Sequence, residues 1–372
     1  MGPLAGLRII EMAGIGPAPF CAMMLADMGA RVLRIEKPGG SSVAGIDAAR
    51  DVLLRGRERI VLDLKQPAAV RAVLGLCAGA DGLLEGFRPG VMERLGLGPE
   101  TCMAANPKLV YGRMTGWGQD GPLAAAAGHD INYIALTGAL DAIGEAGRGP
   151  LPPLNLVGDF GGGGMMLAFG IMCGLWEAGR SGQGQVIDAA MIDGAALLMA
   201  SFHGLAAQGL WPGGRGHNLL DGGAPFYRAY QTADGRYISI GPLEPPFFRR
   251  FLDLTGLPAN LASGQYDAAA WPALRAAIDA RIGEKTLAEW DTLLAGSDVC
   301  YAPVLTLDEV AGHPHNRARD SYVKAGGITQ PAPAPRFSRS KPRGPEKVME
   351  LAENPTEILS RWGLPADLLD NL

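Results

Sequence analysis

Residues 7–35 read LRIIEMAGIGPAPFCAMMLADMGARVLRI, and this stretch decides the fold class of the chain. The apolar run at 7–11 predicts a short buried strand, and the glycines and proline at 14–17 turn the chain. A proline suits the first turn of a helix, and the apolar spacing at 18–28 continues that helix up to a glycine. Residues 31–35 predict the next strand, so that strand, helix and strand alternate.

The same alternation continues downstream. Strands are predicted at 59–62, 82–84 and 109–113, and a helix is predicted at 68–78. Alternation of this kind predicts an α/β fold, a doubly wound, Rossmann-like domain with a mostly parallel sheet. Ligands of such domains bind at the carboxyl ends of the strands.

The pattern changes in the second half of the chain. A long apolar helix is predicted at 157–178, a strand at 185–187 and a helix at 188–205. The glycine-rich stretch at 209–223 is typical of a linker.

Asp234-Gly235, between two β-prone runs, then predicts a hairpin. Helices are predicted after it at 246–256, 268–283 and 285–295. We therefore expect a large α/β domain at 1–205 with 330–372, a linker at 206–224 and a smaller α+β domain at 225–329.

The chain has 372 residues and a formal net charge of −5, which argues against nucleic acid as its main partner. Its positive charge gathers in the first hundred residues, at Arg31, Arg34, Lys37, Arg55, Arg57, Arg59, Arg88 and Arg94. A basic zone in an acidic chain can hold a small anionic ligand such as a phosphorylated cofactor. The alternative is a set of solvated arginines at the surface.

Targeting and metal signals are weak. Charge, glycine or proline interrupts every run of eighteen apolar residues, so we expect no transmembrane helix and no membrane partner. The first residues lack a cationic leader before an apolar block. The five cysteines are scattered and form no CxxC pair, which favours neither a disulfide framework nor a metal site. We expect a cytoplasmic protein.

The first turn resembles the fingerprint of a dinucleotide-binding site. Gly14-x-Gly16 follows a strand and opens a helix, and Glu36 lies twenty residues beyond Gly16. The third glycine position is Pro19, where the motif needs a residue that lets the helix approach the sheet. This departure argues against nicotinamide binding, although the turn could present backbone N–H groups to another phosphate.

Three polar residues, His129, Asp159 and Glu244, lie in glycine-rich or proline-rich contexts inside apolar stretches. Each also has a structural interpretation: a core histidine, a helix residue stabilised by the helix dipole, and a helix cap, respectively. The four glycines at 161–164 would cost about 0.5–1 kcal/mol each in a helix. This cost predicts the close approach of a ligand or of another chain.

Sequence blocks along nearly the whole chain share a further resemblance. The blocks MTGWGQ at 114–119, GHDINY at 128–133 and PLNLVGDFGG at 153–162 carry it, and those at 85–91 and 220–227 support it. Together they resemble the α-methylacyl-CoA racemases of the family III CoA-transferase superfamily. The resemblance implies the interconversion of (2R)- and (2S)-2-methylacyl-CoA thioesters through an enolate.

The resemblance also implies roles for the polar residues. His129 and Asp159 match two acid/base groups that act on opposite faces of the α-carbon. Glu244 matches the glutamate that orients the histidine, and the backbone N–H of Asp130 matches the group that stabilises the enolate oxygen. Such a reaction needs no cofactor apart from the CoA of the substrate, and no metal.

Further residues match the positions that bind CoA and the substrate in this family: Lys37, Leu62, Asp63, Leu64, Lys65, Gly86, Phe87, Arg88, Arg94, Gly128, Ile131, Asn132 and Tyr133. Lys37 stands where we expect an arginine, which keeps the charge and loses the bidentate fork. The resemblance implies an interlocked homodimer, with each site between the large domain of one subunit and the small domain of the other.

Two alternative functions remain open at this point. A CoA transferase of the same superfamily would use the residue at Asp159 as a covalent nucleophile. Such an enzyme has no need of a second base, whereas this chain carries both His129 and Glu244. A non-catalytic CoA-binding protein would use the three polar residues only structurally.

Overall fold

The computed structural model describes residues 2–40, 47–345, 348–352 and 354–369, and the chain divides into two compact units. Unit 1 comprises Met1–Thr137, Leu154–Leu198 and His313–Leu372, and unit 2 comprises Gly138–Pro153 and Met199–Gly312. The grouping differs from the expected domain boundaries in three places. Residues 138–153 and 199–205 belong to unit 2, and residues 313–329 belong to unit 1. The hairpin at the end of the last segment contacts unit 1 through Gln330, whose side chain accepts a hydrogen bond from Arg55.

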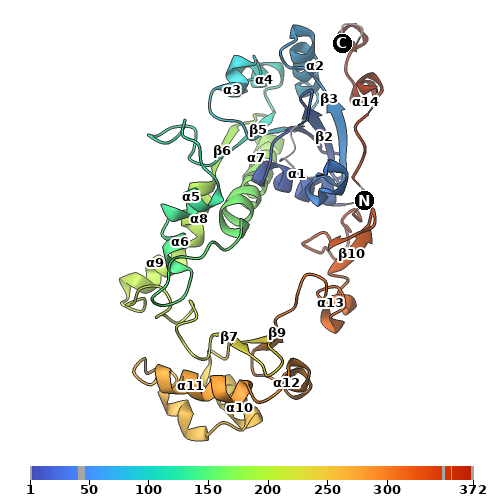
Figure 1. Ribbon diagram of the computed structural model, residues 1–372. Helices are drawn as coiled ribbons and strands as arrows, with labels where there is room; N and C mark the ends of the chain where they lie inside the picture. The colour runs from blue at the N-terminus through green and yellow to red at the C-terminus, as the bar shows by residue number, and fades with distance from the viewer. Residues whose placement is uncertain (1, 41–46, 346–347, 353, 370–372) are drawn as a thin grey trace. The chain divides into compact units, whose positions relative to one another are not determined.

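Unit 1 is built on a six-stranded parallel sheet, as the alternation predicted (Figure 1). Its strands are β1 (Arg8–Met12), β2 (Arg31–Glu36), β3 (Arg57–Val61), β4 (Gly82–Glu85), β5 (Val110–Thr115) and β6 (Val186–Ala190). Their order is β3-β2-β1-β4-β5-β6. Strands β2 and β3 are added on one side of β1 and strands β4 to β6 on the other, so the topological switch point lies between β1 and β4. Ligands of open α/β sheets bind at such a switch point, outside the carboxyl ends of the strands.

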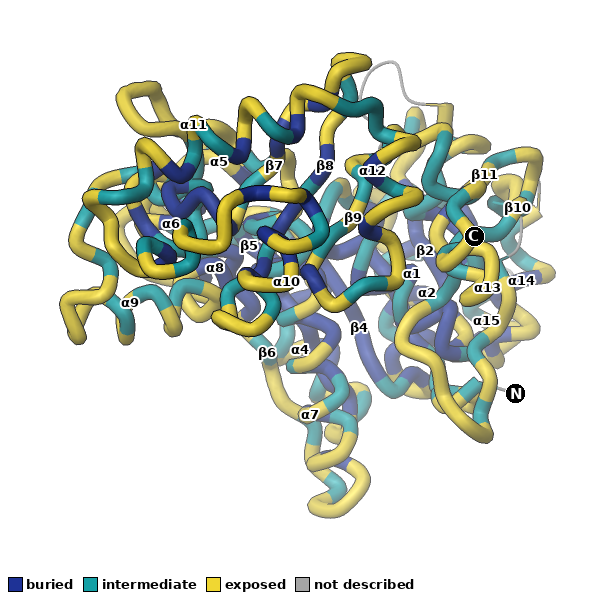
Figure 2. The backbone as a smooth tube through the Cα atoms, turned by 90° about the horizontal axis from the view of Figure 1, so that it is seen from below, coloured by how far each residue is buried: buried dark blue, intermediate teal, exposed yellow. Residues whose placement is uncertain are grey.

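Helices cover both faces of this sheet. On one face Ile9 packs with α1 (Pro17–Asp27) and α7 (Met166–Ser181). On the other face the adjacent residue, Ile10, packs with α2 (Pro67–Cys77). Successive residues of a strand point to opposite faces of the sheet, so apolar strands that are buried on both faces form two apolar cores. The buried strands are dark blue in Figure 2.

The long helix predicted at 157–178 begins as a π-helix at Leu156–Met165 and continues as α7. We expected its glycines to admit a ligand or another chain, but they contact helices of the same unit instead. A Cβ on Gly163 would lie 2.9 Å from both Pro17 and Met191, and one on Gly162 would lie 2.6 Å from the nitrogen of Ala195. The glycines therefore let the π-helix pack against α1 and α8 (Met191–Leu198).

The helix at Leu156–Ser181 is long and apolar enough to cross a membrane by length and composition alone, which the sequence did not predict. Within unit 1 it packs against β5 and β6, and it carries Asp159 near its start. One face of this helix therefore packs in the core of unit 1. The helix predicted at 188–205 is divided instead among the end of β6, α8 and α9 (Ala200–Ala207).

Unit 2 contains the three-stranded antiparallel sheet β7 (Arg228–Gln231), β8 (Tyr237–Ile240) and β9 (Tyr301–Pro303). The hairpin predicted at Asp234-Gly235 joins β7 to β8. The predicted helices are present as α10 (Pro245–Thr255), α11 (Trp271–Ile282) and α12 (Leu287–Leu294). They pack on the sheet around Phe226, Phe248 and Trp290, which are fully buried.

Several short elements were not predicted because they lack a clear period. They are α3 (Val91–Arg94), α4 (Pro99–Ala105), α5 (Asp130–Ala135), α6 (Ala139–Ala142), α13 (Pro314–Ala318), α14 (Pro355–Arg361), α15 (Ala366–Leu369), the strands β10 (Tyr322–Ala325) and β11 (Ile328–Pro331), and 3₁₀ turns at Ala48–Arg50, Val52–Leu54 and Ala259–Gly264. Tertiary contacts stabilise them instead. Trp362, after α14, is buried beneath the guanidinium groups of Arg8 and Arg31.

Candidate active site

A cavity of about 860 Å³ opens at the carboxyl edge of the parallel sheet, with walls that come from unit 1 alone. The segments that follow β1, β4 and β5 form part of the wall, at 14–17, 86–89 and 115–117. The remainder includes His129 at the start of α5 and Asp159 in the π-helix. Residues far apart in the sequence thus meet at the switch point of the sheet.

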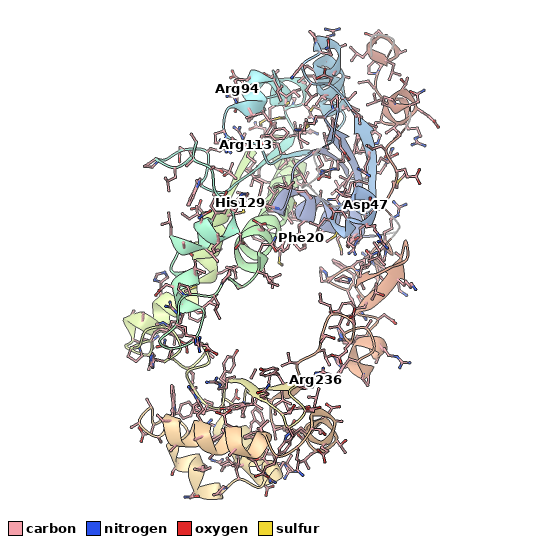
Figure 3. The ribbon with its side chains drawn as sticks, viewed as in Figure 1. Phe20, Asp47, Arg94, Arg113, His129 and Arg236 are labelled. Atoms are coloured by element: carbon pink, nitrogen blue, oxygen red, sulfur yellow. The ribbon has the colours of Figure 1, made fainter. Side chains whose placement is uncertain are left out.

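His129 is the N-cap residue of α5, immediately before the helix. Its backbone N–H donates to Oδ1 of Asn132 at 3.0 Å, which fixes the first turn of the helix. Its side chain is exposed in unit 1 and lines the cavity (Figure 3). These observations exclude the interpretation of His129 as a satisfied core histidine.

Asp130 links α5 to the π-helix. Its side chain is buried, and its Oδ2 accepts a hydrogen bond from the backbone N–H of Asp159 at 2.7 Å. A Cβ on Gly158 would lie 2.4 Å from this same oxygen, so the contact requires glycine there. Because Asp130 is the first residue of α5, its own backbone N–H has no acceptor within the helix.

Asp159 lies in the first turn of the π-helix, half-buried, and its Oδ2 accepts a hydrogen bond from Nδ2 of Asn155 at 2.9 Å. Burial raises the pKa of this carboxyl above its ordinary value, and the nearby charge of Asp130 raises it further. The Asn155 hydrogen bond and the charge of His129 oppose the rise in pKa. A helix-dipole role alone would lower the pKa, so burial and not the dipole dominates.

Six of the predicted substrate and CoA residues line this cavity: Gly86, Phe87, Arg88, Gly128, Asn132 and Tyr133. Arg88 is exposed, and its positive charge acts on Tyr133. The Tyr133 hydroxyl donates to the carbonyl oxygen of Gly128 and its ring meets Trp117 edge to face, at 4.7 Å between centroids. Glycine is required at Gly116, where a Cβ would lie 2.0 Å from the Tyr133 ring.

The other predicted CoA residues do not form the wall of this cavity. Leu62 is buried in the core, and the Asp63 carboxylate accepts from the backbone N–H of Lys65, which closes a turn. Leu64 packs against the same core, and Lys37, Lys65, Arg94 and Ile131 are exposed. Lys37 follows β2 and Leu62 follows β3, at the edge of the sheet where the cavity opens. Their contact with CoA stays a prediction.

The basic zone is neither a set of solvated surface arginines nor a set of free charges for an anionic ligand. Most of its arginines are in ion pairs, and three of them are fully or nearly fully buried in one network. Glu11 pairs with Arg34 and, at 3.1 Å, with Arg57, and Glu36 pairs with Arg59 at 2.7 Å. Arg34, Glu36 and Arg59 also line the cavity. The carboxylate of Glu36 is therefore engaged, and it does not serve as the ribose-binding residue of a dinucleotide site.

The remaining arginines of the zone divide into two groups. Arg55 is buried and forms a bidentate pair with Asp27, and Arg31 pairs with Glu58 near the surface. Arg88 and Arg94 are exposed, and no ion pair involves them within the described part of the chain. The arginines of the basic zone that are exposed and outside ion pairs in the described chain are thus Arg88 and Arg94, which follow β4.

Arg113 on β5 holds that loop, and the sequence analysis did not identify it. Its Nε contacts Glu85 at 2.9 Å, and its Nη1 and Nη2 contact Glu93 of α3 at 2.8 and 3.2 Å. The second oxygen of Glu85 accepts from the backbone N–H of Phe87 at 2.7 Å. In the view of Figure 3, Arg113 lies between Arg94 and His129. Only tertiary pairing reveals this role.

Asn155 is the second residue that the sequence analysis missed. Its position four residues before Asp159 is the spacing of neighbours on a helix surface, which could have identified it. Phe160 also lines the cavity, and its ring lies 4.8 Å from that of Phe20 on α1. Met191 adds a buried, adaptable apolar surface to the wall.

Glu244 lies in unit 2, where it is the residue at which α10 begins. Its side chain is exposed and makes no capping hydrogen bond to the helix. Glu244 thus occupies the N-cap position, as the cap interpretation expected, but its side chain does not cap the helix. Its pairing with His129 stays a prediction.

Comparisons with known proteins cover almost the whole chain. Residues 4–359 match the model of CoA-transferase family III. The Alpha-methylacyl-CoA racemase of Mus musculus is 44% identical over 363 residues, which cover 97% of this chain and 93% of that protein. The protein of the same name from Homo sapiens is 43% identical over 363 residues, with 97% and 93% coverage. A solved structure, of a CAIB/BAIF family protein from Brucella suis, aligns with a TM-score of 0.82 at 27% identity and covers 97% of this chain and 99% of that chain.

Proposed function

The chain belongs to CoA-transferase family III, and on that premise we propose that it is an α-methylacyl-CoA racemase. It interconverts (2R)- and (2S)-2-methylacyl-CoA thioesters by removing and returning the α-proton. One observation carries the proposal: His129 and Asp159 lie on the wall of a single cavity, together with the loop that bears Arg88. Two acid/base groups and an anion-binding loop are what this reaction requires.

Inversion of the α-carbon proceeds through a planar enolate, so one group takes the proton and another returns it from the opposite face. Histidine titrates near neutrality, with an ordinary pKa of about 6.5. The raised pKa of Asp159 brings its carboxyl toward the same range, which makes proton return easier. Each positioned acid/base group contributes about 10²–10⁴-fold to the rate.

The enolate oxygen carries the charge that develops in the reaction. The backbone N–H of Asp130, at the first position of α5, has no acceptor within the helix. It lies at the N-terminus of the helix, where the helix dipole is positive. We assign to it the stabilisation of the enolate. A single oxyanion donor lowers the barrier by about 2.7–4 kcal/mol.

Proton NMR of (2R)-2-methylacyl-CoA in D₂O tests the proposal with the wild-type protein, His129→Ala and Asp159→Ala. The wild type is expected to introduce deuterium at C2 and to form the 2S epimer, and both variants are expected to lose epimerisation by at least a hundredfold. His315→Ala is the matched control, because His315 is exposed on α13 and lies outside the cavity wall. Retention of the C2 proton in every sample would contradict the racemase assignment.

The same samples separate a racemase from a CoA transferase. A transferase would form a covalent intermediate on Asp159 and, with a free acid present, would release a new thioester. Mass spectrometry after incubation with acyl-CoA and a second carboxylic acid is therefore expected to show only the starting thioester. A new thioester that disappears in Asp159→Ala would favour the transferase.

We propose further that the active protein is a homodimer, with Glu244 of the partner subunit beside His129. The support is an exposed apolar face on the helix of Leu156–Ser181, where Leu156, Met165, Phe169 and Trp176 are 57, 50, 68 and 71% exposed. An apolar face of this kind is typical of an interface with another chain. A second copy would bury it.

Mixing two inactive variants tests the shared site. If His129 and Glu244 of one site come from different subunits, a dimer of His129→Ala with Glu244→Ala holds one intact site. A refolded equal mixture is then expected to regain about a quarter of wild-type activity, since about half of random dimers are mixed. Activity no greater than the mean of the two variants would contradict the shared site.

A further inference from the structure

Unit 2 contains a second cavity, of about 1040 Å³, and all of its lining residues belong to that unit. Two arginines line it, Arg228 at the start of β7 and Arg275 in α11. We propose that this cavity is a second small-molecule site, in which Arg228 and Arg275 bind the carboxylate of an apolar acid. No residue of the first cavity lines the second, so variants of the two cavities can be tested separately.

The two guanidinium groups converge on neighbouring carbonyl oxygens. Nη1 of Arg228 donates to the carbonyl of Gly222 at 3.2 Å, and Nη2 of Arg275 reaches the same oxygen at 3.4 Å. Arg275 also donates to the carbonyl of Gly223. Two positive charges are thereby held side by side, which is unfavourable unless a negative charge lies close to both.

No carboxylate forms an ion pair with Arg228 or Arg275, and every residue of unit 2 is described. The ion pairs of unit 2 use other arginines. Both side chains are half-buried, and the Nε atoms of Arg228 and Arg275 are buried without an acceptor. Burial, followed by the charge of Arg228, lowers the pKa of Arg275. Charged donors in this condition cost free energy until an acceptor reaches them.

The nearest acidic side chains are already engaged or do not touch the pair. Asp221 accepts four hydrogen bonds: from the backbone N–H groups of Gly216, Asn218 and Gly223, and from the Asn218 amide. Glu145 pairs with Arg148 at 3.4 Å. Asp279 lies one turn along α11 from Arg275, and the charges of Asp279 and Asp221 both raise the pKa of Arg275 without an ion-pair contact. The positive charge therefore remains directed at the cavity.

The rest of the wall defines the class of ligand. It includes the rings of Tyr227 and Tyr237 and the aliphatic side chains of Ile143, Leu151 and Ile240. A guanidinium fork matches the two oxygens of a carboxylate, and the aromatic and aliphatic wall suits an uncharged hydrocarbon body. A medium-chain carboxylic acid combines the two features.

Equilibrium dialysis of labelled octanoate against the full-length protein tests the site, with and without saturating CoA. We expect one octanoate per chain that CoA does not displace. Arg228→Gln and Arg275→Gln are each expected to weaken this binding at least tenfold, because each removes a charged donor. Arg250→Gln is the matched control, because Arg250 forms an exposed pair with Asp253 away from the cavity.

Two results would overturn the proposal. The first is octanoate binding that is absent, or equally strong in the wild type and both glutamine variants. The second is that inorganic phosphate binds as tightly as octanoate and that the variants weaken both ligands equally. That result would indicate a site for small anions with no preference for an apolar acid. Circular dichroism checks that the variants fold. If a glutamine variant does not fold, Arg228→Lys and Arg275→Lys retain the charge, lose the fork and carry the same comparison.

Discussion

The carboxylate of Asp130 accepts a hydrogen bond from the backbone N–H of Asp159 at 2.7 Å, which joins the first turns of α5 and the π-helix. The same contact places a negative charge next to the Asp159 carboxyl. That charge is the second cause, after burial, of the raised pKa of Asp159. Asp130 thus positions Asp159, the proposed acid/base group, and also raises its pKa.

Replacing Asp130 with asparagine is expected to lower the pKa of Asp159. The amide oxygen of Asn can still accept from the Asp159 N–H, whereas the negative charge that raises the pKa is gone. With a lower pKa, the limb of the pH–rate profile that belongs to Asp159 moves to lower pH, whether Asp159 acts as acid or as base. Proton exchange at C2, followed by NMR between pH 4 and pH 9, measures the shift.

A purely structural role for Asp130 predicts a different result. The rate would then fall at every pH, and the limb would stay where the wild type has it. Asn155→Ala provides a test of opposite sign, because it removes a hydrogen bond that lowers the pKa of Asp159. Its limb is expected to move to higher pH.

The close packing of α8 on the π-helix predicts that Gly194→Ala will be harmful. A Cβ there would lie 1.8 Å from the carbonyl oxygen of Gly162, so a helix must shift. We expect a loss of about 1–3 kcal/mol or more in the free energy of unfolding, and loss of proton exchange because Asp159 moves with the π-helix. Thermal melting and NMR exchange measure the two effects.

Gly179→Ala is the matched control on α7. No atom lies within 4 Å of a Cβ built there, so alanine is expected to be neutral or to stabilise the protein by about 0.5–1 kcal/mol. Equal melting temperatures for Gly194→Ala and the wild type would show that α8 and the π-helix do not pack as described.

Glu11→Gln is expected to destabilise unit 1 strongly. Glu11 is fully buried and pairs with both Arg34 and Arg57, so the change leaves two buried guanidinium groups without their shared carboxylate. Loss of one member of a buried pair costs about 3–5 kcal/mol. Urea unfolding measures the change in the free energy of unfolding.

Glu284→Gln serves as the control for that experiment. Glu284 pairs with Arg281 at the surface, where an ion pair contributes about 0–1 kcal/mol. A similar loss of unfolding free energy in the two variants would show that burial does not make the Glu11 ion pairs contribute more than a surface pair.

Arg113→Lys is expected to impair substrate binding more than chemistry. Lysine keeps the charge, but it cannot contact Glu85 and Glu93 together as the guanidinium does. The loop that carries Arg88 then loses its anchor, and we expect KM for the acyl-CoA to rise by about tenfold with a smaller change in kcat. Steady-state kinetics separate the two constants, and a fall in kcat at unchanged KM would contradict the positioning role.

Much of the fold was predictable because it depends on local pattern. The strands β1 to β5 and the helices α1 and α2 follow from runs of apolar residues bounded by glycine and proline, and the structure confirms them. The short helices α3 and α5 were not predictable, because long-range contacts hold them: Glu93 of α3 binds Arg113, and Asp130 of α5 binds Asp159.

The glycines of the π-helix show the limit of local reasoning most clearly. Their cost in a helix is visible in the sequence and predicts close contact, but it does not identify the partner. We expected a ligand or another chain, and the structure places α1 and α8 there. The partner lies close in space and at an arbitrary distance in the sequence, so only the fold reveals it.

By itself the sequence determined the parallel sheet, the candidate catalytic residues His129 and Asp159, and the family to which the chain belongs. The spacing of apolar residues, the turn residues and short motifs are local properties, so they can be identified from the amino-acid sequence alone. Only the tertiary structure decided that the arginines of the basic zone are mostly paired, that Arg113 anchors the loop after β4 and that Asp130 raises the pKa of Asp159. These depend on charges brought within a few ångströms by folding, and electrostatic energy depends on that distance and on burial, not on separation along the chain.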